Sequence, residues 1–158
     1  MPQSIFYKSK TVPKLVIHQI YLWFITMDNK VIIVSTKPGK WQLPGGKPNE
    51  NENYLETVKR ECFEEAGLTL SEDETPNLFG YYLVSGDETW PENEYLQLRY
   101  FVKSKRFSND ISLSINEPED LKMVKEVKFV ELTAITEYIK WMNNSDEYIA
   151  VLESSNSL

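Results

Sequence analysis

The sequence predicts an α/β (α+β) domain in which a mixed β-sheet is sandwiched between helices. Segments rich in β-branched and aromatic residues fill the first two-thirds of the chain, one helix with an apolar face interrupts them, and helical segments follow. The chain has 158 residues, of which 41% are hydrophobic, so it can bury a core and is not a disordered chain. We therefore expect residues 1–158 to form one domain.

The segments expected to form strands share a high content of β-branched and aromatic residues. They are residues 14–26, 31–35, 41–43, 78–85, 95–103 and 126–131. A turn signal at residues 27–30 predicts that the first two strands form a hairpin. Residues 1–13 are expected to be an irregular lead-in and residues 154–158 an irregular tail, whereas residues 104–125 are ambiguous.

A helix is expected over residues 53–66. Its apolar side chains fall on one face at about 100° per residue, namely Leu55, Val58, Cys62 and Ala66. Gly67 suits the C-terminal cap because glycine tolerates positive φ. Cys62 is therefore expected to be a small buried hydrophobe and not a nucleophile. Two later helices are expected, over residues 133–143 with Thr133 as N-cap and over residues 146–153.

Charge and composition exclude several function classes. The net charge of −7 disfavours binding of polymeric nucleic acid, although a small phosphorylated ligand is allowed if divalent cations bridge it to carboxylates. One cysteine, Cys62, and one histidine, His18, exclude an intrachain disulfide and a multi-histidine metal site. The longest apolar stretch, residues 15–25, is too short to span a membrane, and no signal peptide is visible. We expect a cytoplasmic protein, as a monomer or homodimer.

Three acidic residues share one ridge of the first helix. Glu61, Glu64 and Glu65 have i, i+3, i+4 spacing, so their carboxylates repel one another. A divalent cation of the Mg²⁺ or Mn²⁺ type would remove this repulsion. The alternative is a solvated acidic face with ordinary ion pairs such as Arg60–Glu64. The flanking Gly45–Gly46 favours the metal, because a backbone without Cβ atoms can approach phosphate or metal closely.

These residues resemble the signature of the Nudix hydrolase family, G-x5-E-x7-R-E-U-x-E-E-x-G-U, where U is a bulky apolar residue. The chain has Gly46, Glu52 and then residues 60–68 in this pattern, and Cys62, which is small for its position, is the one departure. Residues 41–47 and 127–132 resemble the flanking strands, and the similarity covers about residues 14–145. The resemblance implies a mixed sheet between helices and hydrolysis of a diphosphate linkage in a nucleoside diphosphate derivative.

The resemblance also implies roles for single residues. Glu61, Glu64, Glu65 and the main-chain carbonyl of Gly46 would hold Mg²⁺, or Mn²⁺. Arg60 would orient the glutamates through ion pairs, and Glu52 would be a supporting carboxylate. Glu64 is the first choice as the general base, with a shared metal role. The later candidates are Glu117, Glu119 and Asp120, for which a solvated loop is the competing interpretation.

Substrate choice is weakly encoded. Gly45, Gly46 and Lys47 would face the phosphates, and Tyr82 or Trp90 could stack on a base, although core packing is the commoner use of such rings. Elimination favours a MutT-like nucleoside triphosphate pyrophosphohydrolase. The alternatives are a hydrolase of ADP-ribose or a dinucleoside polyphosphate, and a non-catalytic nucleotide-sensing domain.

Overall fold

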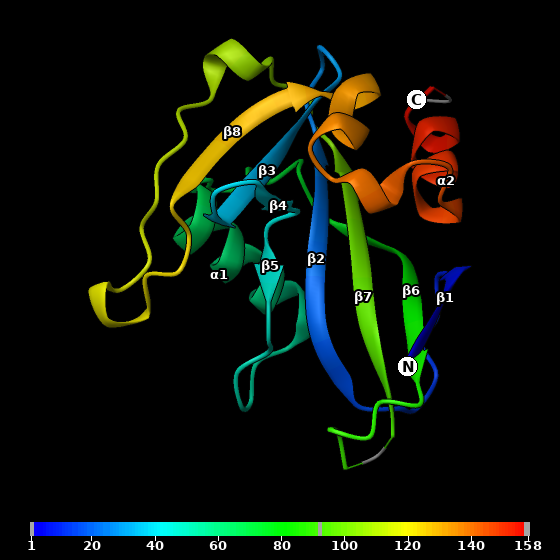
Figure 1. Cartoon of the computed structure of the whole chain (residues 1–158). Helices are drawn as coiled ribbons and strands as arrows, with labels where there is room; N and C mark the ends of the chain where they lie inside the picture. The colour runs from blue at the N-terminus through cyan, green and yellow to red at the C-terminus, as the bar shows by residue number, and fades with distance from the viewer. Residues whose placement is uncertain (1, 92, 157–158) are drawn as a thin grey trace.

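A mixed β-sheet forms the centre of the computed structural model, which describes residues 2–91 and 93–156 (Figure 1). The strand order is β1-β6-β7-β2-β3-β4, with β5 paired to β2 and β8 paired to β3. The strands are β1 (Gln3–Lys8), β2 (Ile17–Ile25), β3 (Lys30–Lys37), β4 (Lys40–Gln42), β5 (Gly45–Gly46), β6 (Asn77–Ser85), β7 (Glu94–Lys103) and β8 (Glu126–Glu131). Strands β2 and β7 are parallel and the other pairs are antiparallel, which confirms the mixed sheet.

Helices cover both faces of the sheet (Figure 1). Helix α1 (Tyr54–Ala66) packs Val58, Cys62 and Ala66 into one buried cluster. Helix α2 (Asp146–Asn156) and the segment before it contribute to a second cluster around Trp23. The predicted sandwich of a sheet between helices is therefore confirmed.

Local signals fix the ends of α1. The side chain of Asn53 accepts a hydrogen bond from the Glu56 amide at 2.8 Å and caps the first turn. Gly67 adopts a left-handed conformation with φ 68°, and its amide donates to the Phe63 carbonyl. The helix that carries the acidic ridge is thus held at both ends, where the sequence predicted it.

The structure corrects two expectations about the ends of the chain and one about an internal helix. The lead-in is not irregular, because β1 pairs with β6 over its whole length and Phe6 packs against Phe79 and Tyr82. The tail is helical to Asn156, since α2 extends beyond residue 153, and residues 157–158 lie outside the described residues. The helix expected over residues 133–143 is instead two 3₁₀ segments, Leu132–Glu137 and Lys140–Met142, separated by Ile139 with φ −108° and ψ 82°.

In the described part of the chain, no helix is both long enough and apolar enough to cross a membrane. The expectation of a cytoplasmic location stays a prediction.

Candidate active site

A pocket of about 500 Å³ lies between α1, β5 and the segment before β8. It gathers most of the residues that the sequence singled out: Gly45, Gly46, Lys47, Arg60, Glu61, Glu64, Glu65 and Glu117. Tyr21 and Gln42 also line it, and nothing in the local sequence had marked them. Residues far apart in the sequence therefore share one cavity, because β5 and the later segment both lie against α1.

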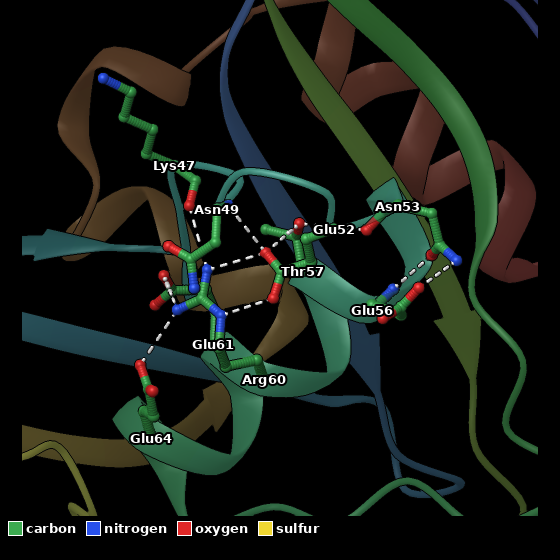
Figure 2. A network of polar contacts seen from close by, with 9 residues as sticks. All are labelled: Lys47, Asn49, Glu52, Asn53, Glu56, Thr57, Arg60, Glu61 and Glu64. Atoms are coloured by element: carbon green, nitrogen blue, oxygen red, sulfur yellow. Dashed lines mark hydrogen bonds and ion pairs between the residues drawn. The ribbon is translucent and has the colours of Figure 1, made fainter.

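Arg60 is the centre of a polar network on α1 (Figure 2). Its Nε donates to Glu52 at 2.8 Å, and its Nη1 donates to Glu61 at 2.9 Å and to Glu64 at 3.2 Å. Its Nη2 donates to the Lys47 carbonyl at 3.0 Å. Arg60 therefore ties the acidic ridge to the loop that follows β5, as an orienting residue would.

Glu52 lies on the other side of Arg60 and does not line the pocket. Hydrogen bonds from Arg60, followed by those from the Asn49 amide and the Thr57 hydroxyl, outweigh its burial and lower the pKa of Glu52 to about 2. Glu52 is thus a permanent anion that holds the guanidinium in place. This geometry suits a supporting carboxylate rather than a base.

Glu61 and Glu65 are largely buried beside the pocket. Burial raises the pKa of Glu61 to about 7 and that of Glu65 to about 8, and the nearby charges of Glu64 and Glu117 add to both shifts. The Gly45 amide donates to Glu65 Oε1 at 2.8 Å and partly offsets the effect on Glu65. A cation in the cavity would stabilise the charged form of these two desolvated carboxylates.

Gly46 lies so close to Glu61 that a side chain at this position would meet the Glu61 carboxylate. A Cβ built on Gly46 would lie 2.4 Å from Glu61 Oε1, and one on Gly45 would lie 2.1 Å from the Ile20 carbonyl oxygen. A Cβ at Gly45 would meet backbone atoms, and a Cβ at Gly46 would force the Glu61 carboxylate or β5 to shift, so both glycines let β5 approach β2 and α1 closely. The backbone of Gly46 thereby lies next to Glu61, one of the carboxylates to which the family resemblance gives a role in metal binding.

The chemistry of this donor set fits a hard divalent cation, because carboxylates and a main-chain carbonyl are the ligands such ions prefer. Within residues 2–91 and 93–156, no three acidic, histidine or cysteine side chains are already arranged as a coordination sphere. Arg60 holds Glu61 and Glu64, and the Gly45 amide holds Glu65. Arg60 binds one oxygen of each carboxylate, Oε1 of Glu61 and Oε2 of Glu64, so the second oxygen of each could bind a cation while Arg60 keeps the side chains in place.

The segment before β8 brings one of the three later base candidates to the pocket. Glu117 lines it, and its carboxylate accepts hydrogen bonds from the amides of Met123 and Val124, both at 3.1 Å. The Asn116 amide donates to the Glu64 carbonyl at 2.7 Å, which fixes this segment to α1. Glu119 and Asp120 lie in the 3₁₀ turn Glu119–Leu121 and are not among the residues that line the pocket.

A protein-family model matches most of this chain. Residues 19–152, which include most of β2, part of α2 and every residue of the pocket, match the NUDIX domain. The chain belongs to the NUDIX domain family. The resemblance read from Gly46 to Leu68 is therefore confirmed.

The chain is similar in sequence to two 8-oxo-dGTP diphosphatases of Buchnera aphidicola. That of the subspecies Schizaphis graminum is 39% identical over 56 residues, which are 32% of this chain and 43% of the relative. That of Acyrthosiphon pisum is 35% identical over 78 residues, which are 48% of this chain and 56% of the relative. The NUDIX chain thus matches about half the length of these relatives.

Solved structures share the NUDIX fold at low sequence identity. A mutant of the Bacillus subtilis pyrophosphohydrolase BsRppH has a TM-score of 0.65 at 17% identity, covering 98% of this chain and 92% of that one. A C. elegans Ap4A hydrolase binary complex has a TM-score of 0.63 at 13% identity, covering 90% of this chain and 100% of that one. These likenesses support the fold.

The two aromatic candidates lie outside the NUDIX pocket. Tyr82 donates its hydroxyl to Glu147 at 2.8 Å and lines a different cavity, next to Arg99. Trp90 packs edge-on against His18 with ring centroids 4.3 Å apart. The Lys47 ammonium lies 6.0 Å from the Trp90 ring, so the tryptophan contacts a pocket residue without lining the pocket itself.

Proposed function

We propose that this NUDIX chain is a divalent-metal-dependent hydrolase that cleaves the diphosphate linkage of a nucleotide. Its expected substrate is a nucleoside triphosphate, and its products are a nucleoside monophosphate and pyrophosphate. One observation carries the proposal: a single pocket collects Glu61, Glu64, Glu65 and Glu117 beside the backbone of Gly46. The names of the two Buchnera relatives support this class of reaction.

Glu61, Glu64, Glu65 and the Gly46 carbonyl are the residues proposed to hold Mg²⁺, with Mn²⁺ as an alternative. When bound, such an ion neutralises phosphate charge and lowers the pKa of a coordinated water. Arg60 fixes the glutamates, and Glu52 fixes Arg60. Lys47 adds a positive charge at the pocket wall, where it can attract the anionic phosphates.

Hydrolysis needs a group that accepts a proton from the attacking water. A carboxylate oxygen of Glu64 takes this proton as the water oxygen bonds to phosphorus and the bridging P–O bond breaks. The electron pair of that bond leaves with the pyrophosphate. Glu117 is the competing base, because it lines the same pocket and two backbone amides hold its carboxylate.

A nucleotide panel tests the reaction. The protein is incubated with nucleoside triphosphates, 8-oxo-dGTP, ADP-ribose and a dinucleoside tetraphosphate, with Mg²⁺ or Mn²⁺, and the products are identified by chromatography. We expect pyrophosphate and a monophosphate from at least one triphosphate, and no turnover with excess chelator. Full activity in chelator, or nucleotide binding without any product, would contradict the proposal, and the latter result would favour a nucleotide sensor.

Paired variants separate the two candidate bases. Glu64→Gln is expected to lower kcat at least ~100-fold, whereas Glu117→Gln should lower it by less than about tenfold. Glu119→Gln, on the same segment but outside the pocket lining, is the matched control and should keep full activity. A larger loss in Glu117→Gln than in Glu64→Gln would transfer the role of base to Glu117.

A further inference from the structure

A recess on the α2 side of the sheet adjoins the pocket that contains Glu61, Glu64 and Glu65, which we call the carboxylate pocket. The recess consists of two neighbouring cavities of about 150 and 210 Å³, which share Gln97, Arg99 and Trp141 on their walls. Tyr21 and Gln42 line both this recess and the carboxylate pocket. Each of the two cavities is small beside a typical small-molecule site of about 300–1,000 Å³, so the recess suits one part of a nucleotide whose phosphates lie over the glutamates.

Arg99 is the charged group of the recess, and it is held rigidly. Its Nε donates to Glu147 Oε2 at 2.8 Å, and its guanidinium lies 4.7 Å from the Tyr21 ring centroid and 4.8 Å from that of Tyr82. Glu147, at the start of α2, is fully buried and also accepts hydrogen bonds from the Trp23 indole and the Tyr82 hydroxyl. Glu147 is therefore a positioning residue for Arg99.

The outer edge of this guanidinium is free to bind a ligand. Its Nη1 reaches only the neighbouring Leu98 carbonyl, at 3.4 Å, and Nη2 makes no hydrogen bond to any described residue. Arg99 lines both cavities, and a guanidinium presents its donors in a fixed planar fork, so an acceptor from outside the protein suits this position. The side-chain amides of Gln42 and Gln97 likewise donate no hydrogen bond within the described part of the chain.

We propose that Arg99 reads the base of the substrate and selects a 6-keto purine, as in guanine or hypoxanthine, over adenine. A 6-keto purine presents two neighbouring acceptors, O6 and N7, which match the two donors of a guanidinium edge. Adenine presents an amino group in place of O6, which would face the guanidinium donor to donor. Trp141, whose exposed fraction is 58%, lies at the edge of the recess and offers a ring on which the base can stack.

This inference rests on the proposed function, but it is tested separately by binding. Affinities of the protein for GMP, IMP and AMP are measured by calorimetry, with tryptophan fluorescence as a second readout. GMP and IMP are expected to bind at least about tenfold more tightly than AMP, since a bidentate contact gives this order of discrimination. Equal affinities, or no binding of any monophosphate, would overturn the assignment of base selectivity to Arg99. The proposed hydrolase activity would not be affected, because the triphosphate panel tests it separately.

Variants test whether Arg99 is the source of the selectivity. Arg99→Lys keeps the ion pair with Glu147 but loses the forked edge. The ratio of the affinity for GMP to that for AMP should therefore fall about tenfold, while the protein stays folded. Glu147→Gln should reduce the same ratio, and Arg99→Lys should also lower the kcat/KM ratio of GTP to ATP. Arg106→Lys, an arginine paired with a buried glutamate away from the recess, is the matched control and should keep both ratios. A folded Arg99→Lys protein with unchanged selectivity would refute the assignment.

Discussion

Gly46 shows how a single missing Cβ shapes the candidate active site. Alanine at this position would bring its Cβ within 2.4 Å of Glu61 Oε1, so the glutamate or β5 must move. We expect Gly46→Ala to lower kcat/KM at least about tenfold, because catalytic groups displaced by about 1 Å can cost 10²-fold. Steady-state hydrolysis of the best triphosphate from the panel measures the effect.

Gly39→Ala is the comparison for this substitution. A Cβ at Gly39 meets no atom within 4 Å, although φ +76° makes alanine there strained by about 1 kcal/mol. It should lower the melting temperature slightly and leave kcat/KM unchanged. If both variants lost activity equally, the close contact with Glu61 would not be the cause.

Cys62 is expected to be chemically silent in the folded protein. Its side chain is 1% exposed, and burial raises the pKa of its thiol far above the usual range, so little thiolate forms at neutral pH. A thiol reagent such as Ellman's should react with less than about a tenth of the protein in buffer and fully in denaturant. Rapid reaction under native conditions would show that α1 opens around the thiol.

Residue spacing predicted the acidic ridge because helix geometry alone determines which side chains are neighbours. It could not choose among Glu117, Glu119 and Asp120, since the path of an irregular segment depends on contacts such as that between Asn116 and the Glu64 carbonyl. It also could not place Tyr82, because the direction of a strand side chain depends on what covers each face. Arg99 stands out in the sequence as a charged residue within an apolar strand, but its partner Glu147 could not be predicted because it lies 48 residues away.

At the scale of elements, Glu74 joins the segment after α1 to the segment that follows β7. Its carboxylate accepts hydrogen bonds from the Ser71 amide at 2.9 Å, from Arg106 at 2.6 Å and from the Ser104 hydroxyl. Burial alone would raise the pKa of Glu74, but these hydrogen bonds outweigh it and lower the pKa to about 2. The anion therefore stabilises the fold above pH 4.5, its usual value, and this contribution is lost as pH falls towards 2.

Glu74→Gln should accordingly destabilise the protein by about 1–3 kcal/mol at pH 7 and by much less at pH 3. Urea unfolding at both pH values, followed by circular dichroism, measures the difference. Glu72→Gln, an exposed neighbour, should have little effect at either pH. A Glu74→Gln penalty that did not shrink in acid would show that the carboxylate charge is not what stabilises this contact.

Elements with local signals were predicted well, and elements that depend on distant partners were not. Helix α1 carries its own cap residues and apolar face, so its bounds agree with the prediction to within one residue. Strand β1 is short and partly polar, and its stability comes from pairing with β6, which lies far along the chain. The 3₁₀ segments before α2 have helical composition, but the backbone conformation of Ile139 interrupts them.

For the whole molecule, the net charge of −7 and the carboxylate pocket together predict cation-dependent stability. Mg²⁺ that binds only the native state stabilises it by about 2.7 kcal/mol at about a hundredfold excess over Kd. We expect Mg²⁺ to raise the melting temperature by several degrees relative to NaCl of equal ionic strength.

Differential scanning fluorimetry of wild type and Glu61→Gln provides the measurement. The variant should lose most of the Mg²⁺ shift, and Glu72→Gln, which removes the same charge from an exposed position, should keep it. Equal shifts in all three proteins would point to general screening of the negative charge in place of a specific site.

The parallel pairing of β2 with β7 has a consequence for biosynthesis. Residues 17–25 find their parallel partner in residues 96–103, so the middle of the sheet cannot close while the ribosome is still translating the first half of the chain. Until then the apolar edge of β2 is open to wrong partners, including other nascent chains. Recombinant production should therefore benefit from slower synthesis at low temperature or from added chaperones.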